Sequence, residues 1–303
     1  MEKLRSDTSN GAALAVGSVA LTVAVVLTFA RLGGPWAAGV NFVYISLAAA
    51  LVLGIGFYAN TSGRPAPWLS AVYVSGFVLA VFSVVNFADL LGTSTSNSRT
   101  VVWVTLLLLV VAGAIAWFRN SGVMTLACGL LGIILAVALI DWLFTPDELT
   151  ETARWVLIFV FIGYFVIALL ELVPQTYRQV AVVDAAGFAL LIIGLTFASR
   201  GVFGAVALPG ADSAVPTVSA GWELVILVGS LLLVAYALLE GAPGPGYLAG
   251  FNLALFVVLA ALNEEQQLLW WPVIIGLVAI LAFAAAFTGT RIPTLADLKA
   301  RRT

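Results

Sequence analysis

The sequence predicts an all-α integral membrane protein with about ten transmembrane helices. Of its 303 residues, 62% are hydrophobic and only 9% are charged, and the mean hydropathy is +1.13. A soluble domain carries roughly 25% charged residues, so this chain cannot cover a core with a surface that water solvates. Its apolar runs reach the roughly 20 residues that a spanning helix requires, and they lack the period-two alternation of barrel strands.

Ten segments have this length and composition. They cover residues 11–31, 36–59, 67–91, 101–118, 122–144, 155–173, 181–199, 221–239, 247–263 and 270–289. The first follows a basic start, as a signal peptide would, but its length and the lack of a small-residue cleavage site predict a retained helix. Short turns such as "NTSGRPAP" and "EGAPGPG" join most segments, and only residues 200–220 are expected to form a longer loop.

The basic residues of the two tails predict the orientation in a cell membrane. Six of the 13 bases lie there: Lys3, Arg5, Arg291, Lys299, Arg301 and Arg302. By the positive-inside rule both termini are cytoplasmic, and residues 200–220 face outward. Tryptophans at the outer starts of the even-numbered segments agree with this orientation, because indole prefers the headgroup layer.

The spacing of those tryptophans indicates an internal repeat. Trp36, Trp103, Trp155, Trp222 and Trp270 are separated by 67, 52, 67 and 48 residues. The pattern predicts two four-helix units, 36–154 and 155–269, with one flanking helix and tail at each end (1–35 and 270–303). A local match between "SGFVLAVFSVVNFAD" and "AGFALLIIGLTFAS" agrees. An even-numbered repeat keeps its orientation, so an axis along the membrane normal would relate the units.

Charged residues are expected only near the membrane surfaces. Each of the 15 acids and 13 bases falls in a tail, in a loop or within a few residues of a segment end. A charge at the helix centre costs roughly 2.5–3.5 kcal/mol and marks an ion pathway by default, and none is expected here. The candidate interface charges are Asp89, Asp141, Glu171, Arg178 and Asp184.

The last three flank the turn between the sixth and seventh segments, where Arg178 can reach either carboxylate. One interpretation is a set of interfacial anchors with an ion pair that fixes a hairpin. The other is a cytoplasmic gate or a docking charge for a partner. Asp184 also suits the positive end of a helix N-terminus.

Uncharged polar residues lie deeper in the segments. Asn41, Asn86, Tyr164 and Asn252 are candidates for interhelical hydrogen bonds or for the lining of a solute path. The outer acids Asp89, Asp141, Glu223, Glu264 and Glu265 could gather a cation through carboxylate oxygens. No loop has the ligand spacing that a metal site requires, so no metal is predicted.

The sequence excludes most catalytic chemistry. It has no histidine, one cysteine (Cys128) and no phosphate-binding or nucleophile motif. We therefore predict no catalytic residues, no cofactor and no enzymatic activity.

A net charge of −2 with no basic patch outside the tails argues against nucleic acid as a partner. The partners expected are membrane lipids and the proteins of a membrane complex. The function predicted is a non-catalytic structural or accessory subunit of a membrane assembly. The alternative is a passive facilitator or carrier for a small neutral or lipid-like solute.

Overall fold

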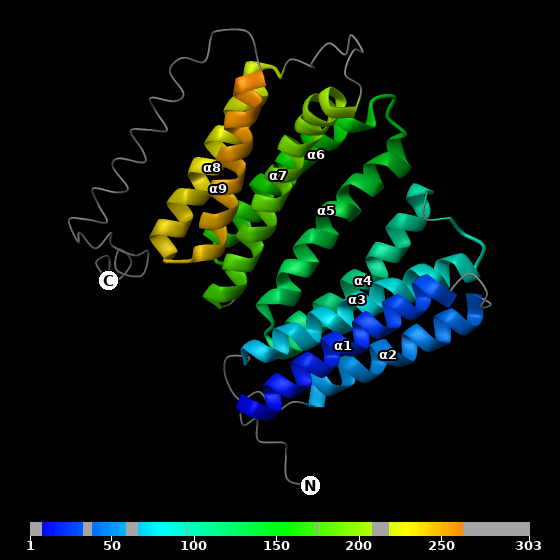
Figure 1. Ribbon diagram of the computed structural model, residues 1–303. Coiled ribbons are helices and arrows are strands. Elements are labelled where there is room, and N and C mark those ends of the chain that lie inside the picture. The colour runs from blue at the N-terminus through cyan, green and yellow to red at the C-terminus, as the bar shows by residue number, and fades with distance from the viewer. Residues whose placement is uncertain are drawn as a thin grey trace. The chain divides into compact units, whose positions relative to one another are not determined.

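The computed structural model describes residues 8–32, 38–58, 66–94, 96–173, 175–207 and 218–262. These residues form helices joined by turns, with no strand among them (Figure 1). The helices are α1 (Thr8–Leu32), α2 (Ala38–Tyr58), α3 (Pro67–Leu90), α4 (Ser98–Arg119), α5 (Gly122–Phe144), α6 (Leu149–Leu169), α7 (Thr176–Ala207), α8 (Ala220–Glu240) and α9 (Pro243–Leu262).

All nine of these helices are long and apolar enough to cross a membrane. The all-helical class predicted from the sequence is therefore confirmed for the described residues, and their nine apolar helices are those expected of a multispanning membrane protein. The expected tenth helix, 270–289, and both basic tails lie outside the described residues.

Local sequence signals set several of the helix ends. Pro67 opens α3, where its missing N–H costs nothing. The Ser121 hydroxyl accepts a hydrogen bond from the Met124 N–H at 3.4 Å and caps α5. Asn120 and Gly241 end α4 and α8 in the left-handed conformation, which both residue types tolerate better than most.

Two helices differ most from the predicted bounds. Helix α6 begins at Leu149 rather than 155, and α7 runs from Thr176 to Ala207 rather than from 181 to 199. The expected loop over 200–220 is therefore helical in its first part. The predicted segments, 155–173 and 181–199, excluded Arg154, Arg178 and Arg200. A charged side chain is costly to place in the lipid core, but it does not end a helix. No proline interrupts the sequence of α7 before Pro209.

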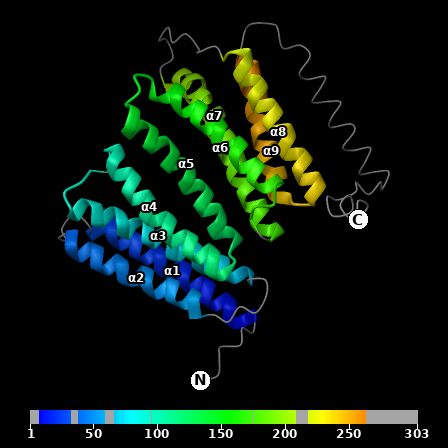
Figure 2. The same ribbon diagram turned by 180° about the vertical axis from the view of Figure 1, so that it is seen from behind.

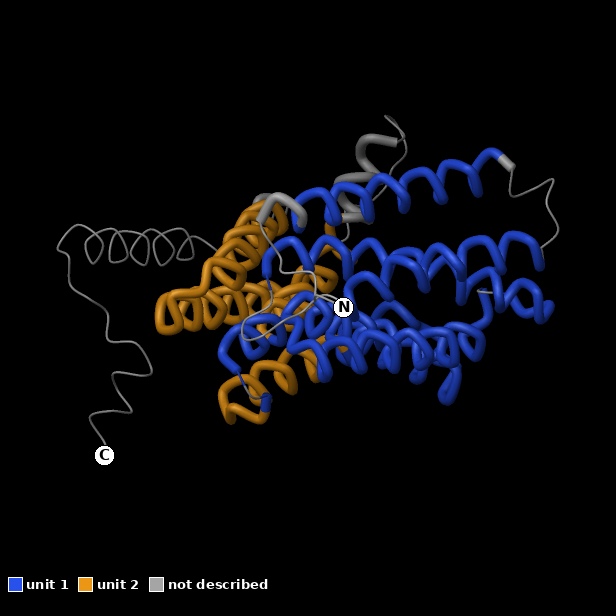
Figure 3. The backbone as a smooth tube through the Cα atoms, turned by 90° about the horizontal axis from the view of Figure 1, so that it is seen from below, with its two compact units in different colours: residues 1–156, 173–182 blue, residues 157–172, 183–303 orange. Residues whose placement is uncertain are grey.

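The chain divides into two compact units, shown in Figure 3. Unit 1 contains Met1–Val156 and Val173–Val182, and unit 2 contains Leu157–Leu172 and Val183–Thr303. Helices α6 and α7 each contribute one part to each unit. In unit 1, α2 and α3 run antiparallel in a constant register, because Ser46 faces Ser83 and Gly56 faces Tyr73.

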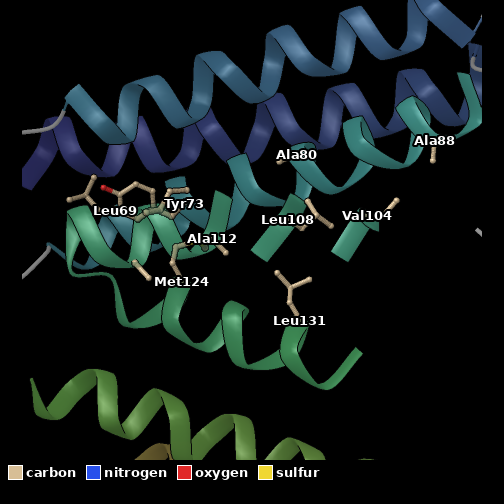
Figure 4. Close-up of a cluster of buried hydrophobic side chains, with 11 residues drawn as sticks. Leu69, Tyr73, Ala80, Ala88, Val104, Leu108, Ala112, Met124 and Leu131 are labelled. Carbon is tan, nitrogen blue, oxygen red and sulfur yellow. The ribbon is translucent and has the colours of Figure 1, made fainter. Parts of the chain in front are cut away.

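Unit 1 has a packed apolar core between α3, α4 and α5 (Figure 4). Its buried members are Leu69, Tyr73, Ala80, Ala88, Val104, Leu108, Ala112, Ile115, Ala116, Met124 and Leu131. Lipid tails are as apolar as these side chains, so the helices associate through close packing and interhelical hydrogen bonds rather than through the hydrophobic effect. The Tyr73 hydroxyl supplies one such bond, donated to the Gly56 carbonyl at 3.1 Å.

Unit 2 is held by glycine contacts between α7 and the α8–α9 hairpin, whose two helices lie side by side in opposite views (Figure 1, Figure 2). Gly187 and Gly194 of α7 face Leu248 and Leu255 of α9, with a spacing of seven residues on both helices. A Cβ at Gly194 would lie 2.4 Å from Leu255 Cδ2. Glycine thus permits an approach that a larger residue would block, and the shared spacing shows that α7 and α9 are parallel.

The tandem repeat stays a prediction. The two glycines of the matched segments pack on different neighbours: Gly76 of α3 faces Leu53 of α2, whereas Gly187 of α7 faces Leu248 of α9 and Leu233 of α8. The local sequence match therefore does not correspond to a shared packing contact.

Candidate functional site

Arg178 lies in the first turn of α7 rather than in a turn between helices, and it binds within unit 1. Its Nε donates a hydrogen bond to Thr125 Oγ1 at 3.2 Å, and that hydroxyl donates to the Ser121 carbonyl at 3.0 Å. Only 8% of the Arg178 surface is exposed. The side chain joins the start of α7 to the start of α5.

Glu171 lies in the turn after α6. It is exposed, and its φ of 56° places it in the left-handed region, where its N–H donates to the Ala168 carbonyl at 3.1 Å. Glu171 and Asp184 belong to unit 2, whereas Arg178 belongs to unit 1. The expected cluster of these three residues therefore stays a prediction.

Asp184 is packed against α9. A Cβ on Gly244 would lie 2.7 Å from both carboxylate oxygens of Asp184, so the carboxylate rests directly on the glycine backbone. Its Oδ1 is buried and has no hydrogen-bond partner among the described residues. Gly244 is in the first turn of α9, just after the α8–α9 turn. Asp184 therefore lies level with the α8–α9 turn, near one end of unit 2. Along α7 it is about 12 Å from the first residue of that helix.

Tyr236 of α8 lies beside this carboxylate. In the antiparallel pair α7–α8, Gly187 faces Leu233 and Leu190 faces Gly229. The same register brings Tyr236 level with Asp184. The Tyr236 hydroxyl is buried, has no hydrogen-bond partner among the described residues, and belongs to a side chain that is 4% exposed.

Two further contacts complete the surroundings of Tyr236. Its ring packs edge-to-face on Phe165 of α6, with 5.9 Å between the ring centroids. Glu240 lies one turn further along α8, on the same face of the helix as Tyr236. We call Asp184, Tyr236, Glu240 and Gly244 the α7–α9 acidic site. Of this set only Asp184 was predicted from the sequence. Tyr236, Glu240 and Gly244 were not, because only the helix register brings them together.

Asn252 lies one layer deeper in unit 2. Its Nδ2 donates to the Gly187 carbonyl at 3.2 Å and to the Leu248 carbonyl at 2.9 Å, and the side chain is fully buried. This is an interhelical contact between α9 and α7. The Asn252 Oδ1 has no hydrogen-bond partner among the described residues.

The other candidate residues are spread over both units. Asn41 and Asn86 are buried in unit 1, and Asn86 Nδ2 donates to the Phe82 carbonyl of its own helix at 2.8 Å. Tyr164 is half-buried in the part of α6 that belongs to unit 2. Asp89 is exposed at the end of α3, while Asp141 accepts a hydrogen bond from Ser98 across the α4–α5 hairpin.

No group of three metal-binding side chains occurs within the described ranges. Glu223 is buried in the first turn of α8, whereas Asp89 and Asp141 belong to unit 1. Glu264 and Glu265, the other acids expected at a cation site, lie outside the described residues.

Unit 1 contains an apolar cavity of about 410 Å³ between α3, α4 and α5. Apolar side chains such as Phe77, Leu108 and Leu130 line it, together with the hydroxyl-bearing Thr105. Its volume is within the range of small-molecule sites, roughly 300–1,000 Å³. Its lining suits an acyl chain better than a polar solute, which would need several hydrogen-bonding groups.

Comparisons of the chain with protein families, with curated proteins and with solved structures found no match. The class of the protein therefore rests on its own helices, which are those of a multispanning membrane protein.

Proposed function

We propose that this protein is a non-catalytic structural or accessory subunit of a membrane assembly. The observation that carries the proposal is that polar side chains form hydrogen bonds between helices. Arg178 binds Thr125, Ser46 binds Ser83, and Asn252 binds the Gly187 carbonyl. Side chains used in this way hold a bundle together and are not free to coordinate a passing solute.

The first helix supports a role within a larger assembly. Only 17% of its membrane-crossing window is buried inside the chain. Its large exposed residues, Val16, Val19, Val23 and Leu27, recur at steps of three and four residues and form one stripe. This spacing is typical of the seam between two packed helices, and a partner helix would cover it.

The proposal includes a cell-membrane location with both termini in the cytoplasm, and it includes no enzymatic activity. The orientation is supported by the six bases in the two tails. The proposed lack of enzymatic activity is supported by the absence of histidine and of a nucleophile motif from the sequence.

Site-specific photo-crosslinking in native membranes tests the proposal. A photoreactive residue at Val16 or Val23 of α1 should crosslink to one protein species of defined mass. The same residue at Val110, which is exposed on α4 (66% exposed), serves as the matched control and should crosslink mainly to lipid. Crosslinks to lipid alone at all three positions would contradict the proposal.

The second candidate function is a carrier for a lipid-like solute, and the apolar cavity of unit 1 favours it. A bulky replacement such as Ala127→Trp would fill the space between α3 and α5. If the protein is such a carrier, the chain reconstituted in liposomes should move a fluorescent lipid between leaflets, and the replacement should abolish that movement. An accessory subunit alone should show no transfer in either form.

A further inference from the structure

The described side chains of unit 2 carry acidic groups but no basic group. Its described side chains, in 157–172, 183–198 and 218–260, include four carboxylates and neither lysine nor arginine. The four are Glu171, Asp184, Glu223 and Glu240. A carboxylate withdrawn from water is costly unless a positive charge or hydrogen-bond donors compensate it.

The α7–α9 acidic site lacks such compensation among the described residues. Asp184 Oδ1 and the Tyr236 hydroxyl are both buried and without a hydrogen-bond partner in the described part of the chain. They lie level with each other on α7 and α8, and Glu240 lies one turn from Tyr236 on the same face of α8. Gly244 leaves no side chain between the carboxylate and α9.

The chemistry of these atoms defines what fits them. Two carboxylates and a phenolic oxygen all accept hydrogen bonds, and a primary ammonium group offers three donors together with one positive charge. Calcium takes six to eight oxygen ligands, more than these three side chains supply. A quaternary ammonium group carries the charge but has no N–H to donate.

We infer that the α7–α9 acidic site binds a primary ammonium group through Asp184, Tyr236 and Glu240. Two sources share this chemistry: the headgroup of an ethanolamine lipid, and a free small amine. The site lies within one turn of the α8–α9 turn, where a headgroup can reach it. The inference goes beyond the proposed function and is independent of it, because a subunit or a carrier could hold such a group.

Binding is tested on the purified full chain in detergent with ethanolammonium chloride as the probe. Tetramethylammonium chloride and sodium chloride at the same ionic strength are the reference salts. Ethanolammonium should raise the midpoint of thermal unfolding saturably, and neither reference salt should do so. An equal rise with tetramethylammonium or sodium, or no rise with ethanolammonium, would overturn the inference.

Three variants connect binding to the site. Asp184→Asn and Tyr236→Phe should each weaken ethanolammonium binding by at least about tenfold, as expected for lost hydrogen bonds to a charged group. Tyr236→Phe keeps the ring that packs on Phe165, so it tests the hydroxyl even if Asp184→Asn fails to fold. Glu171→Gln, at the exposed carboxylate of the same unit, is the control and should bind as the wild type does. Unchanged binding in Tyr236→Phe and in a folded Asp184→Asn would overturn the inference.

Lipid bilayer discs distinguish the two sources. If the group is a headgroup, the protein should retain phosphatidylethanolamine over phosphatidylcholine, measured by native mass spectrometry, and free ethanolammonium should compete with that retention. If it is a free amine, ethanolammonium should bind in phosphatidylcholine discs without any lipid preference. Binding in neither kind of disc would overturn the inference.

Discussion

The contact between α7 and α9 makes a quantitative prediction for Gly194→Val. A Cβ at this position would lie 2.4 Å from Leu255 Cδ2 and 3.0 Å from Leu255 Cγ. Carbon atoms pack at about 3.5–4.0 Å, so the leucine or the helix must move by about 1 Å, and valine adds two further methyl groups. Overpacking of this kind costs about 1–3 kcal/mol, and we expect the upper part of that range.

Gly250→Val is the matched control for this prediction. Gly250 lies on α9 and is exposed, and a Cβ there would meet nothing within 4 Å. Both variants change helix propensity in the same way, so the difference between their stabilities measures the cost of the packing clash alone. Reversible unfolding in mixed detergent and SDS micelles measures it. Gly194→Val should be less stable than Gly250→Val by about 2–3 kcal/mol, and equal stabilities would refute the packing of α7 on α9.

Three further predictions follow from the helix contacts and the sequence. Arg178→Met should lower the free energy of unfolding by about 1.5–3 kcal/mol, because it removes a buried charge-assisted hydrogen bond to Thr125. Arg99→Met, at an exposed position, is the control and should change the free energy of unfolding little. Similar effects of the two variants would contradict the role of the Thr125 contact. In a chain with Cys128 replaced by serine, an impermeant thiol reagent applied to intact cells should label a cysteine at Ser213 and spare one at Thr303; the reverse pattern would show an inverted orientation. In an experimental structure, α2–α5 should overlay α6–α9 after rotation about an axis near the membrane normal, and a different order of helices would refute the repeat.

Most of the fold could be predicted because membrane helices follow from one strong signal. An apolar run of about 20 residues has few alternatives to a spanning helix, and the described helices lie where such runs occur. Their ends were harder to predict. Thr176–Arg178 and Arg200 are polar or charged but helical, because a helix can continue into the headgroup layer, where charge is tolerated.

The candidate site was less predictable for a different reason. Asp184 was identified by its charge, but its neighbours depend on the rotation of three helices about their axes. Tyr236 faces Asp184 through the antiparallel register of α7 and α8, and Gly244 faces it through the start of α9. The sequence of any one helix therefore does not determine which polar residues meet.

The hydrogen bond of Arg178 to Thr125 was not predicted for the same reason. Thr125 is an ordinary threonine in an apolar segment, and its importance comes from the position of α5 beside the first turn of α7. A sequence search that paired each charged residue with polar residues near other helix ends would have included this pair among its candidates.

The central claim, that the protein is a subunit of a membrane assembly, is tested most directly by the mass of the particle extracted from native membranes. Extraction with an amphipathic polymer keeps the surrounding lipid and avoids detergent. Native mass spectrometry of the particle should then show the 31.7-kDa chain together with a second protein species in a fixed ratio. A particle that holds this chain and lipid alone, at native expression levels, would contradict the claim.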